Sequence, residues 1–197
     1  MRMALPAVYG ERLDAAVALA LGDFRSFVRK GTSIPYITHL FSVMSLVGEY
    51  GGDEDQLIAA VLHDWLEDVP GARVEVLEAR FGPRVASLVA GLSDSVGHPK
   101  PPWRERKERY LGHLRVASPD LKLISAADKV HNCASIRRDL ADVGPAIFDR
   151  FTGGRDGTLW YYEELGVALR EDWRHPLGDR VIAEAAGLRR EAELVSR

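Results

Sequence analysis

Residues 57–69 read LIAAVLHDWLEDV, and this stretch carries both a helical pattern and the most unusual group of charges in the chain. Its apolar residues recur at the spacing of one helix face: Leu57, Ile58, Val61, Leu62, Trp65, Leu66 and Val69. The opposite face would hold His63, Asp64, Glu67 and Asp68, with the two pairs one turn apart. Acidic side chains at a helix C-terminus oppose its macrodipole, so no local effect favours them. The pattern therefore fits either a solvated helix end or a metal site.

Helical spacing recurs along nearly the whole chain and predicts an all-α fold. We expect helices at 7–21, 36–50, 53–69, 73–81, 83–94, 103–116, 118–140, 143–151, 156–171 and 178–195, and a loop at 97–102. A short β-like run at 121–124 lies inside a helical pattern and does not change this assignment. No repeat or linker divides the chain. We predict a single domain over residues 1–197, with a motif core at 24–140 and C-terminal helices at 143–195 packed on it.

Composition excludes several classes of partner. The 26 basic and 29 acidic residues give a formal net charge of −3, which argues against a nucleic acid polymer or an anionic membrane. A single cysteine, Cys133, excludes an internal disulfide and fits a reducing compartment. The first residues do not resemble a signal peptide, and no apolar run approaches the ~20 residues of a membrane span. We expect a cytoplasmic protein with a small-molecule partner, of open oligomeric state.

Two further residues favour a metal site over a solvated helix end. His39 lies in PYITHLFSVM (35–44), and Asp128 lies in the apolar run LKLISAADKVHN (121–132). Burying a carboxylate in such a run is costly unless it is paired or bound to a metal. A hydrogen-bonded surface histidine and an ion pair between Asp128 and Lys129 are the simpler alternatives. The chain nevertheless has the order H…HD…D on three of its main predicted helices.

At these positions the sequence resembles the HD superfamily of metal-dependent phosphohydrolases. Within it, the resemblance is closest to the alarmone hydrolases: the hydrolase domains of the Rel/Spo proteins and the small alarmone hydrolases of the Mesh1 type. The matching segments are RKGTSIPYITH (29–39), LIAAVLHDWLEDV (57–69), FGPRVASLVAGLSD (81–94), LISAADKVHN (123–132) and FTGGRDGTLWYY (151–162). The resemblance implies an HD-domain helical bundle, of roughly eight to ten helices at ordinary helix lengths. It also implies 3′-pyrophosphohydrolysis of (p)ppGpp or (p)ppApp.

The resemblance also implies roles for individual residues. The metal ligands would be His39, His63, Asp64 and Asp128. The acid pair that acts on the attacking water would be Glu67 and Asp68. Two nitrogen and two oxygen ligands suit Mn²⁺, although Fe²⁺, Co²⁺, Ni²⁺ and Zn²⁺ also fit; alarmone hydrolases are manganese enzymes, which favours Mn²⁺. Such a cation lowers the pKa of bound water and screens phosphate charge.

Substrate contacts are expected from positive and neutral polar residues. By the resemblance, Arg29 contacts the substrate and Asn132 lines the nucleotide site. Lys30 and Lys107 are further phosphate-binding candidates, although the mixed charges around Lys107, in WRERKERY (103–110), also fit a solvated helix surface.

Two hydroxyl groups complete the predicted substrate site. Ser135 follows Asn132 by almost one helical turn, and it either contacts a base or ribose or bonds to the helix backbone. We expect the Tyr162 hydroxyl to reach the pocket, although its helical repeat is equally satisfied by packing. His131 belongs to the motif by position but has no evident role.

Three departures from the Rel/Spo pattern concern the nucleotide site. Phe24 and Phe27 stand where those proteins carry His and Gln, and Leu40 replaces the Pro that follows the first ligand. None of them removes a metal ligand. Other functions of the same core are an HD nucleotidase or another small-nucleotide phosphohydrolase, such as an NADPH phosphatase. A nucleotide-binding sensor with a degenerate site is the non-enzyme alternative, and the retention of all ligand and acid residues argues against it.

Overall fold

The computed structural model describes residues 9–94 and 101–195, and within these ranges it is all-α, as predicted. The elements are α1 (Glu11–Asp23), α2 (Ile37–Glu49), α3 (Glu54–Val61), α4 (Trp65–Asp68), α5 (Val74–Phe81), α6 (Pro83–Leu92), α7 (Trp103–Arg115), α8 (Pro119–Val143), the 3-10 helix η1 (Gly144–Arg150), α9 (Gly154–Arg170) and α10 (Pro176–Leu194). In the described part of the chain, no helix is long and apolar enough to cross a membrane.

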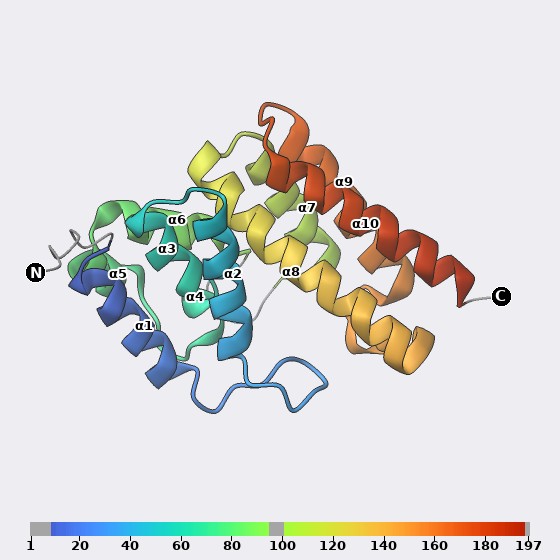
Figure 1. The fold of residues 1–197 in the computed structure, drawn as a ribbon, viewed down its shortest axis with the longest axis horizontal. Helices are drawn as coiled ribbons and strands as arrows, with labels where there is room; N and C mark the ends of the chain where they lie inside the picture. Colours follow the sequence, from blue (N-terminus) through green and yellow to red (C-terminus); the bar gives the residue numbers. More distant parts are fainter. Residues whose placement is uncertain (1–8, 95–100, 196–197) are drawn as a thin grey trace, which may run out of the picture.

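Helix α8 is the central element of the fold. It runs between the N-terminal helices and the pair α9–α10 (Figure 1), and it contacts α2, α3, α6, α9, α10 and η1. Residues 121–128 are all buried, so neighbours surround this part of the helix on every side. The Ser118 side chain accepts the N–H of Leu121 and caps the helix, and Pro119 occupies its first position. The residues that pack α8 also bring the N-terminal and C-terminal halves together.

The segment between α1 and α2 forms a long loop that projects from the bundle (Figure 1). An isolated bridge pairs Val28 with Pro35, and the N–H of Arg29 donates to the carbonyl of Ile34 at 2.8 Å. Gly31 supplies the left-handed turn at the tip, with φ of +71°. The loop therefore holds Arg29 in a fixed, hairpin-like conformation.

The predicted helix at 53–69 is wrong at its centre. Helix α3 ends at Val61 and α4 begins at Trp65, so Leu62, His63 and Asp64 form a turn. The N–H of Trp65 donates to the carbonyl of Leu62, three residues back rather than four. The supposed alignment of His63 over Glu67 on one continuous helix face therefore does not hold.

Other differences are smaller. The segment expected as a helix at 143–151 is the 3-10 helix η1, and the first helix begins at Glu11 rather than at residue 7. Residues 7 and 8, and most of the loop expected at 97–102, lie outside the described residues. The run at 121–124 is helical, as expected.

Candidate active site

Four side chains meet at the centre of the bundle. His39, His63 and Asp128 are buried, and each offers one ligand atom within 4.8 Å of the others. The Nε2 atoms of His39 and His63 are 3.1 Å apart, and Asp128 Oδ1 lies 3.3 Å from the first and 3.6 Å from the second. Asp64 Oδ2 lies 2.9 Å from His63 Nε2 and 3.5 Å from His39 Nε2. Two imidazoles and two carboxylates in this arrangement have the donor chemistry of a divalent metal site.

The turn at 62–64 explains how His63 reaches this group. His63 Nδ1 lies 2.8 Å from the carbonyl oxygen of Ala60. A carbonyl can only accept, so Nδ1 carries a proton, and Nε2 is the nitrogen that faces the other three side chains and would bind a metal. A ligand histidine in metal sites is commonly held by such a bond from its second nitrogen.

Electrostatics favour a cation at the same point. Burial opposes protonation of His63, but Asp64 and Asp128 outweigh it and raise the pKa of His63 to about 10. Burial also opposes charge on Asp64 and Asp128, but their cationic neighbours hold both carboxyl pKa values well below the usual range; Lys129 has the largest such effect on Asp128. One buried carboxylate, Asp128, and one half-buried carboxylate, Asp64, thus stay charged and favour a positive charge between them and the imidazoles. The residues present therefore fit a divalent cation.

Both carboxylates of the group are held by hydrogen bonds. The Tyr36 hydroxyl donates to Asp64 Oδ2 at 2.6 Å, and the Asn132 amide and Lys129 ammonium donate to Asp128. Burial, with Asp64 as the next cause, raises the pKa of Tyr36 well above its ordinary value, so its hydroxyl remains a donor. Sequence reasoning missed Tyr36. Its position in PYITH, one turn before His39, was the available signal.

Phe24, one of the departures from the Rel/Spo pattern, packs behind this tyrosine. The rings of Phe24 and Tyr36 stack with centroids 5.5 Å apart and an interplanar angle of 13°. Phe27 contacts Phe24 edge-on at 5.2 Å. The two phenylalanines therefore support the hydroxyl that holds Asp64, and neither takes the place of a ligand.

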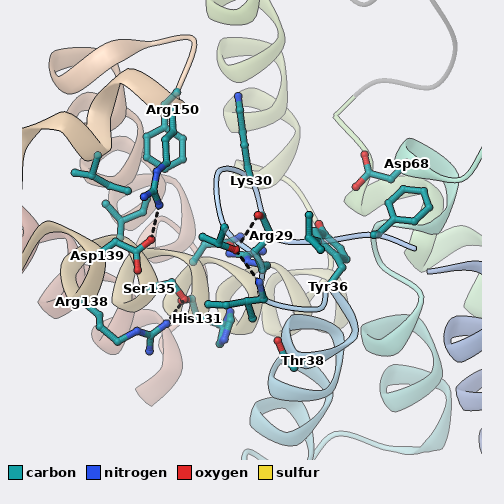
Figure 2. Close-up of a pocket in the computed structure, with 18 of the residues that line it drawn as sticks. Arg29, Lys30, Tyr36, Thr38, Asp68, His131, Ser135, Arg138, Asp139 and Arg150 are labelled. Atoms are coloured by element: carbon teal, nitrogen blue, oxygen red, sulfur yellow. Dashed lines mark hydrogen bonds and ion pairs between the residues drawn. The ribbon is translucent and has the colours of Figure 1, made fainter. Parts of the chain in front are cut away.

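A cavity of about 610 Å³ (Figure 2) is lined in part by Tyr36, His131 and Asn132, which bond to members of the group of four side chains. Of the residues predicted to act on substrate or water, the lining includes Arg29, Lys30, Asp68, Asn132, Ser135 and Tyr162. Figure 2 shows Arg29 and Lys30 in the middle of the cavity, with Asp68 on one side and Arg150 with Asp139 on the other. Arg29 Nη2 donates to Asn132 Oδ1 at 2.5 Å, and Asn132 in turn bonds to Asp128. The cavity is thus linked to the ligand group by a chain of hydrogen bonds.

Lys107 and Glu67 do not line this cavity. The Lys107 ammonium bonds to Asp94 at 2.7 Å and lies 4.8 Å from the centroid of the Tyr161 ring. Burial and Lys129 lower the pKa of Lys107, and Glu67 is among the charges that raise it. Glu67 and Asp68 are adjacent on α4, yet they act in different surroundings: Glu67 near Lys107, and Asp68 at the cavity wall.

Comparison with known proteins identifies the fold family. Residues 16–159 match the HD domain family. The chain belongs to the HD domain family. The predicted resemblance is therefore confirmed at the level of the family.

Several relatives of this HD-domain protein are named as hydrolases of (p)ppGpp. The guanosine-3′,5′-bis(diphosphate) 3′-pyrophosphohydrolase MESH1 of Danio rerio is 35% identical over 106 residues, which are 53% of this chain and 57% of that protein. The MESH1 of Mus musculus is 35% identical over 135 residues, 64% of this chain and 72% of that protein. The bifunctional (p)ppGpp synthase/hydrolase SpoT of Escherichia coli is 36% identical over 202 residues, 95% of this chain and 28% of SpoT. The chain thus spans little more than half of one MESH1 and about a quarter of SpoT. These relatives support the predicted phosphohydrolase class.

Solved structures agree with the fold. A metazoan ortholog of SpoT, described as hydrolysing ppGpp, matches with a TM-score of 0.73 and 26% identity, over 98% of this chain and 99% of that chain. The lmo0812 protein of Listeria monocytogenes matches with a TM-score of 0.68 and 24% identity, over 79% of this chain and 99% of that chain. The second likeness supports the fold alone.

Proposed function

We propose that this protein removes pyrophosphate from the 3′ position of (p)ppGpp or (p)ppApp, using Mn²⁺ held by His39, His63, Asp64 and Asp128. The observation that carries the proposal is the position of the ligand group beside a cavity lined by Arg29 and other polar residues. A site with metal-ligand chemistry at one end and positive charge along its wall suits a nucleotide with more than one phosphate group. The named activity of the MESH1 and SpoT relatives supports the choice of substrate.

In this proposal the protein positions the substrate and moves one proton. Arg29 and Lys30 neutralise phosphate charge, while Asn132 and Ser135 contact the nucleoside. A bound divalent metal supplies Lewis acidity at the reacting phosphate. The oxygen of a water attacks the phosphorus attached to the 3′ oxygen. A bond forms between this phosphorus and the water oxygen, and the bond between the phosphorus and the 3′ oxygen breaks. The acid pair on α4 accepts the proton of that water, and a proton returns to the 3′ oxygen. The products are pyrophosphate and a nucleoside 5′-diphosphate (or triphosphate) with a free 3′ hydroxyl.

A substrate screen of the purified protein tests the proposal. The protein is incubated with Mn²⁺ and ppGpp, ppApp, NADPH or mononucleotides, and pyrophosphate and orthophosphate are measured separately. We expect pyrophosphate from an alarmone and little orthophosphate from the others. Release of orthophosphate alone, from NADPH or mononucleotides, would replace the proposal with a phosphatase or nucleotidase. Tight alarmone binding without any product would favour the sensor. Repeating the positive reaction with Fe²⁺, Co²⁺, Ni²⁺ and Zn²⁺ tests the choice of metal.

A further inference from the structure

His131 is the residue of the α8 motif that the function described above leaves without a role. Its Nδ1 lies 2.8 Å from the Nδ1 of His39, and the two ring centroids are 4.8 Å apart. We infer that His131 is a positioning residue that accepts the Nδ1 proton of His39 and thereby fixes the His39 ring with Nε2 toward the metal. The inference rests on the metal site of the proposed function but not on the identity of the substrate.

The proton arrangement follows from the contacts of His39. A neutral imidazole carries one proton, and a nitrogen that binds a metal must carry none. His39 Nε2 faces the other donor atoms, at 3.1 Å from His63 Nε2 and 3.3 Å from Asp128 Oδ1. The proton of His39 therefore belongs on Nδ1. A contact of 2.8 Å between two nitrogens needs one donor and one acceptor, so His131 presents the lone pair of its Nδ1.

The other histidine ligand is held in the same way by a different group. His63 Nδ1 donates to the carbonyl of Ala60 at 2.8 Å. That acceptor is a backbone carbonyl, so it remains in place when the Ala60 side chain is changed, provided that the backbone does not move. The acceptor of His39 is a side chain, so mutation can remove it. Mutation can therefore delete the bond between His39 and His131, while the bond between His63 and the Ala60 carbonyl stays as an internal reference.

His131 lies on the same helix as Asp128, one of the proposed metal ligands. It follows Asp128 by three residues, and the intervening turn is helical, so one helix supplies a ligand and the acceptor that orients a second ligand. His131 also lines the substrate cavity. Helix α8 would then hold His39 of α2 in register with Asp128, in addition to the packing between these two helices.

Substitution of His131 tests the inference by metal affinity. In His131→Asn the amide oxygen can occupy the position of Nδ1 and accept the same proton. In His131→Leu the volume is similar but no acceptor remains. We expect His131→Leu to bind Mn²⁺ roughly 10–100-fold more weakly than the unmodified chain, the usual effect of losing an outer partner of a ligand histidine. His131→Asn should bind close to the unmodified chain. The control is His113→Leu, at an exposed histidine on α7, which should leave affinity unchanged.

The measurements are equilibrium dialysis against Mn²⁺ alone and two-bond ¹H–¹⁵N spectra of the Zn²⁺-loaded protein. The spectra should show His39 protonated at Nδ1. Circular dichroism in chelator confirms that each variant folds. If His131→Leu does not fold, His131→Gln replaces it, because its longer side chain carries the amide beyond the Nδ1 position.

Three results would overturn the inference: equal Mn²⁺ affinity without the acceptor, an Asn variant as weak as the variant without one, or a proton on His39 Nε2. A failure of the proposed function looks different. A chain that binds Mn²⁺ with the expected order of affinities but cleaves no alarmone would leave His131 in its role and remove the substrate assignment.

Discussion

Amide substitution of the acid pair on α4 separates chemistry from metal binding. Glu67→Gln and Asp68→Asn keep the shape of each side chain and remove the charge that accepts a proton. By the resemblance to HD proteins, both residues act on the attacking water and are not ligands of the metal. Each variant should therefore keep about one metal ion per chain, the stoichiometry of a single-ion site. Loss of a positioned acid–base group lowers kcat by roughly 10²–10⁴-fold, or about 2.7–5.4 kcal/mol of transition-state stabilisation at about 1.36 kcal/mol for each factor of ten.

The surroundings of the two residues make a finer expectation possible. Asp68 lines the substrate cavity, whereas Glu67 acts near Lys107. Replacing Asp68 should also change KM, because a negative charge beside the bound phosphates is removed. Replacing Glu67 should change kcat with a smaller effect on KM. If both act on one water, the double variant should lose little more than the worse single variant.

The assay combines steady-state kinetics with metal analysis on the same preparations. His63→Ala is the reference for a lost ligand and should lose both metal and activity, since its Nε2 lies within 3.6 Å of all three partners. Near-full turnover in both amide variants would refute the reasoning and return Glu67 and Asp68 to a solvated helix end. Loss of metal from either variant would instead make that residue a ligand.

Three further predictions concern substrate, loop and metal. Arg29→Ala should raise KM by about 10–150-fold with little change in kcat, because one charge-assisted hydrogen bond contributes about 1.5–3 kcal/mol; an effect on kcat alone would contradict a binding role. Gly31→Ala and Gly51→Ala both force alanine to positive φ, at about 1–2 kcal/mol in denaturant unfolding. Only at Gly31 would the new Cβ lie 2.7 Å from Arg150 Cδ, so only Gly31→Ala should also raise KM. Chelation should lower Tm, since metal at 100 times its Kd stabilises the fold by about 2.7 kcal/mol, and His63→Ala should show no such shift; an equal shift in both would place the metal elsewhere.

Much of the fold follows from hydrophobic periodicity. The ends of α2, α5 and α7 lie within one residue of the predicted limits. The break between α3 and α4 could not be predicted in this way. Apolar residues continue at helical spacing through Leu62 and Trp65, and both are buried. At this break His63 Nδ1 bonds to the Ala60 carbonyl, three residues back, and Nε2 faces His39 on α2, a partner that no local pattern contains.

In the candidate site, the sequence indicates which residues take part but not which neighbours hold them in place. The resemblance to the HD superfamily, carried by the order H…HD…D, predicted a metal group of His39, His63, Asp64 and Asp128. The partners that orient them depend on which helices pack together. Tyr36 behind Asp64 and His131 behind His39 become visible only once α2 and α8 are in contact.

For Lys107, the sequence shows a positive charge but does not show that this charge is paired with Asp94. The predicted phosphate contact stays a prediction, since the structure pairs this ammonium with Asp94 outside the cavity. Asp94 also accepts from Arg106 at 2.7 Å, so an approaching phosphate would have to compete with a carboxylate that already serves two cations.

Helix α8 explains why one stretch of sequence reaches both the candidate metal ligands and the far end of the cavity. Its polar residues recur at helical spacing: Asp128, His131, Asn132, Ser135, Arg138 and Asp139. Each of the last five lines the cavity, and Asp139 accepts from Arg150 at 2.8 Å. At about 1.5 Å per residue, the strip from Asp128 to Asp139 is roughly 16 Å long. Residues 121–128 are all buried, so the helix that carries this strip is anchored in the core at the end of the strip nearest Asp128. The spacing between Asp128 and Arg138 is therefore a property of one helix, and in the proposed function it would set the distance between the metal and a basic residue at the far end of the cavity.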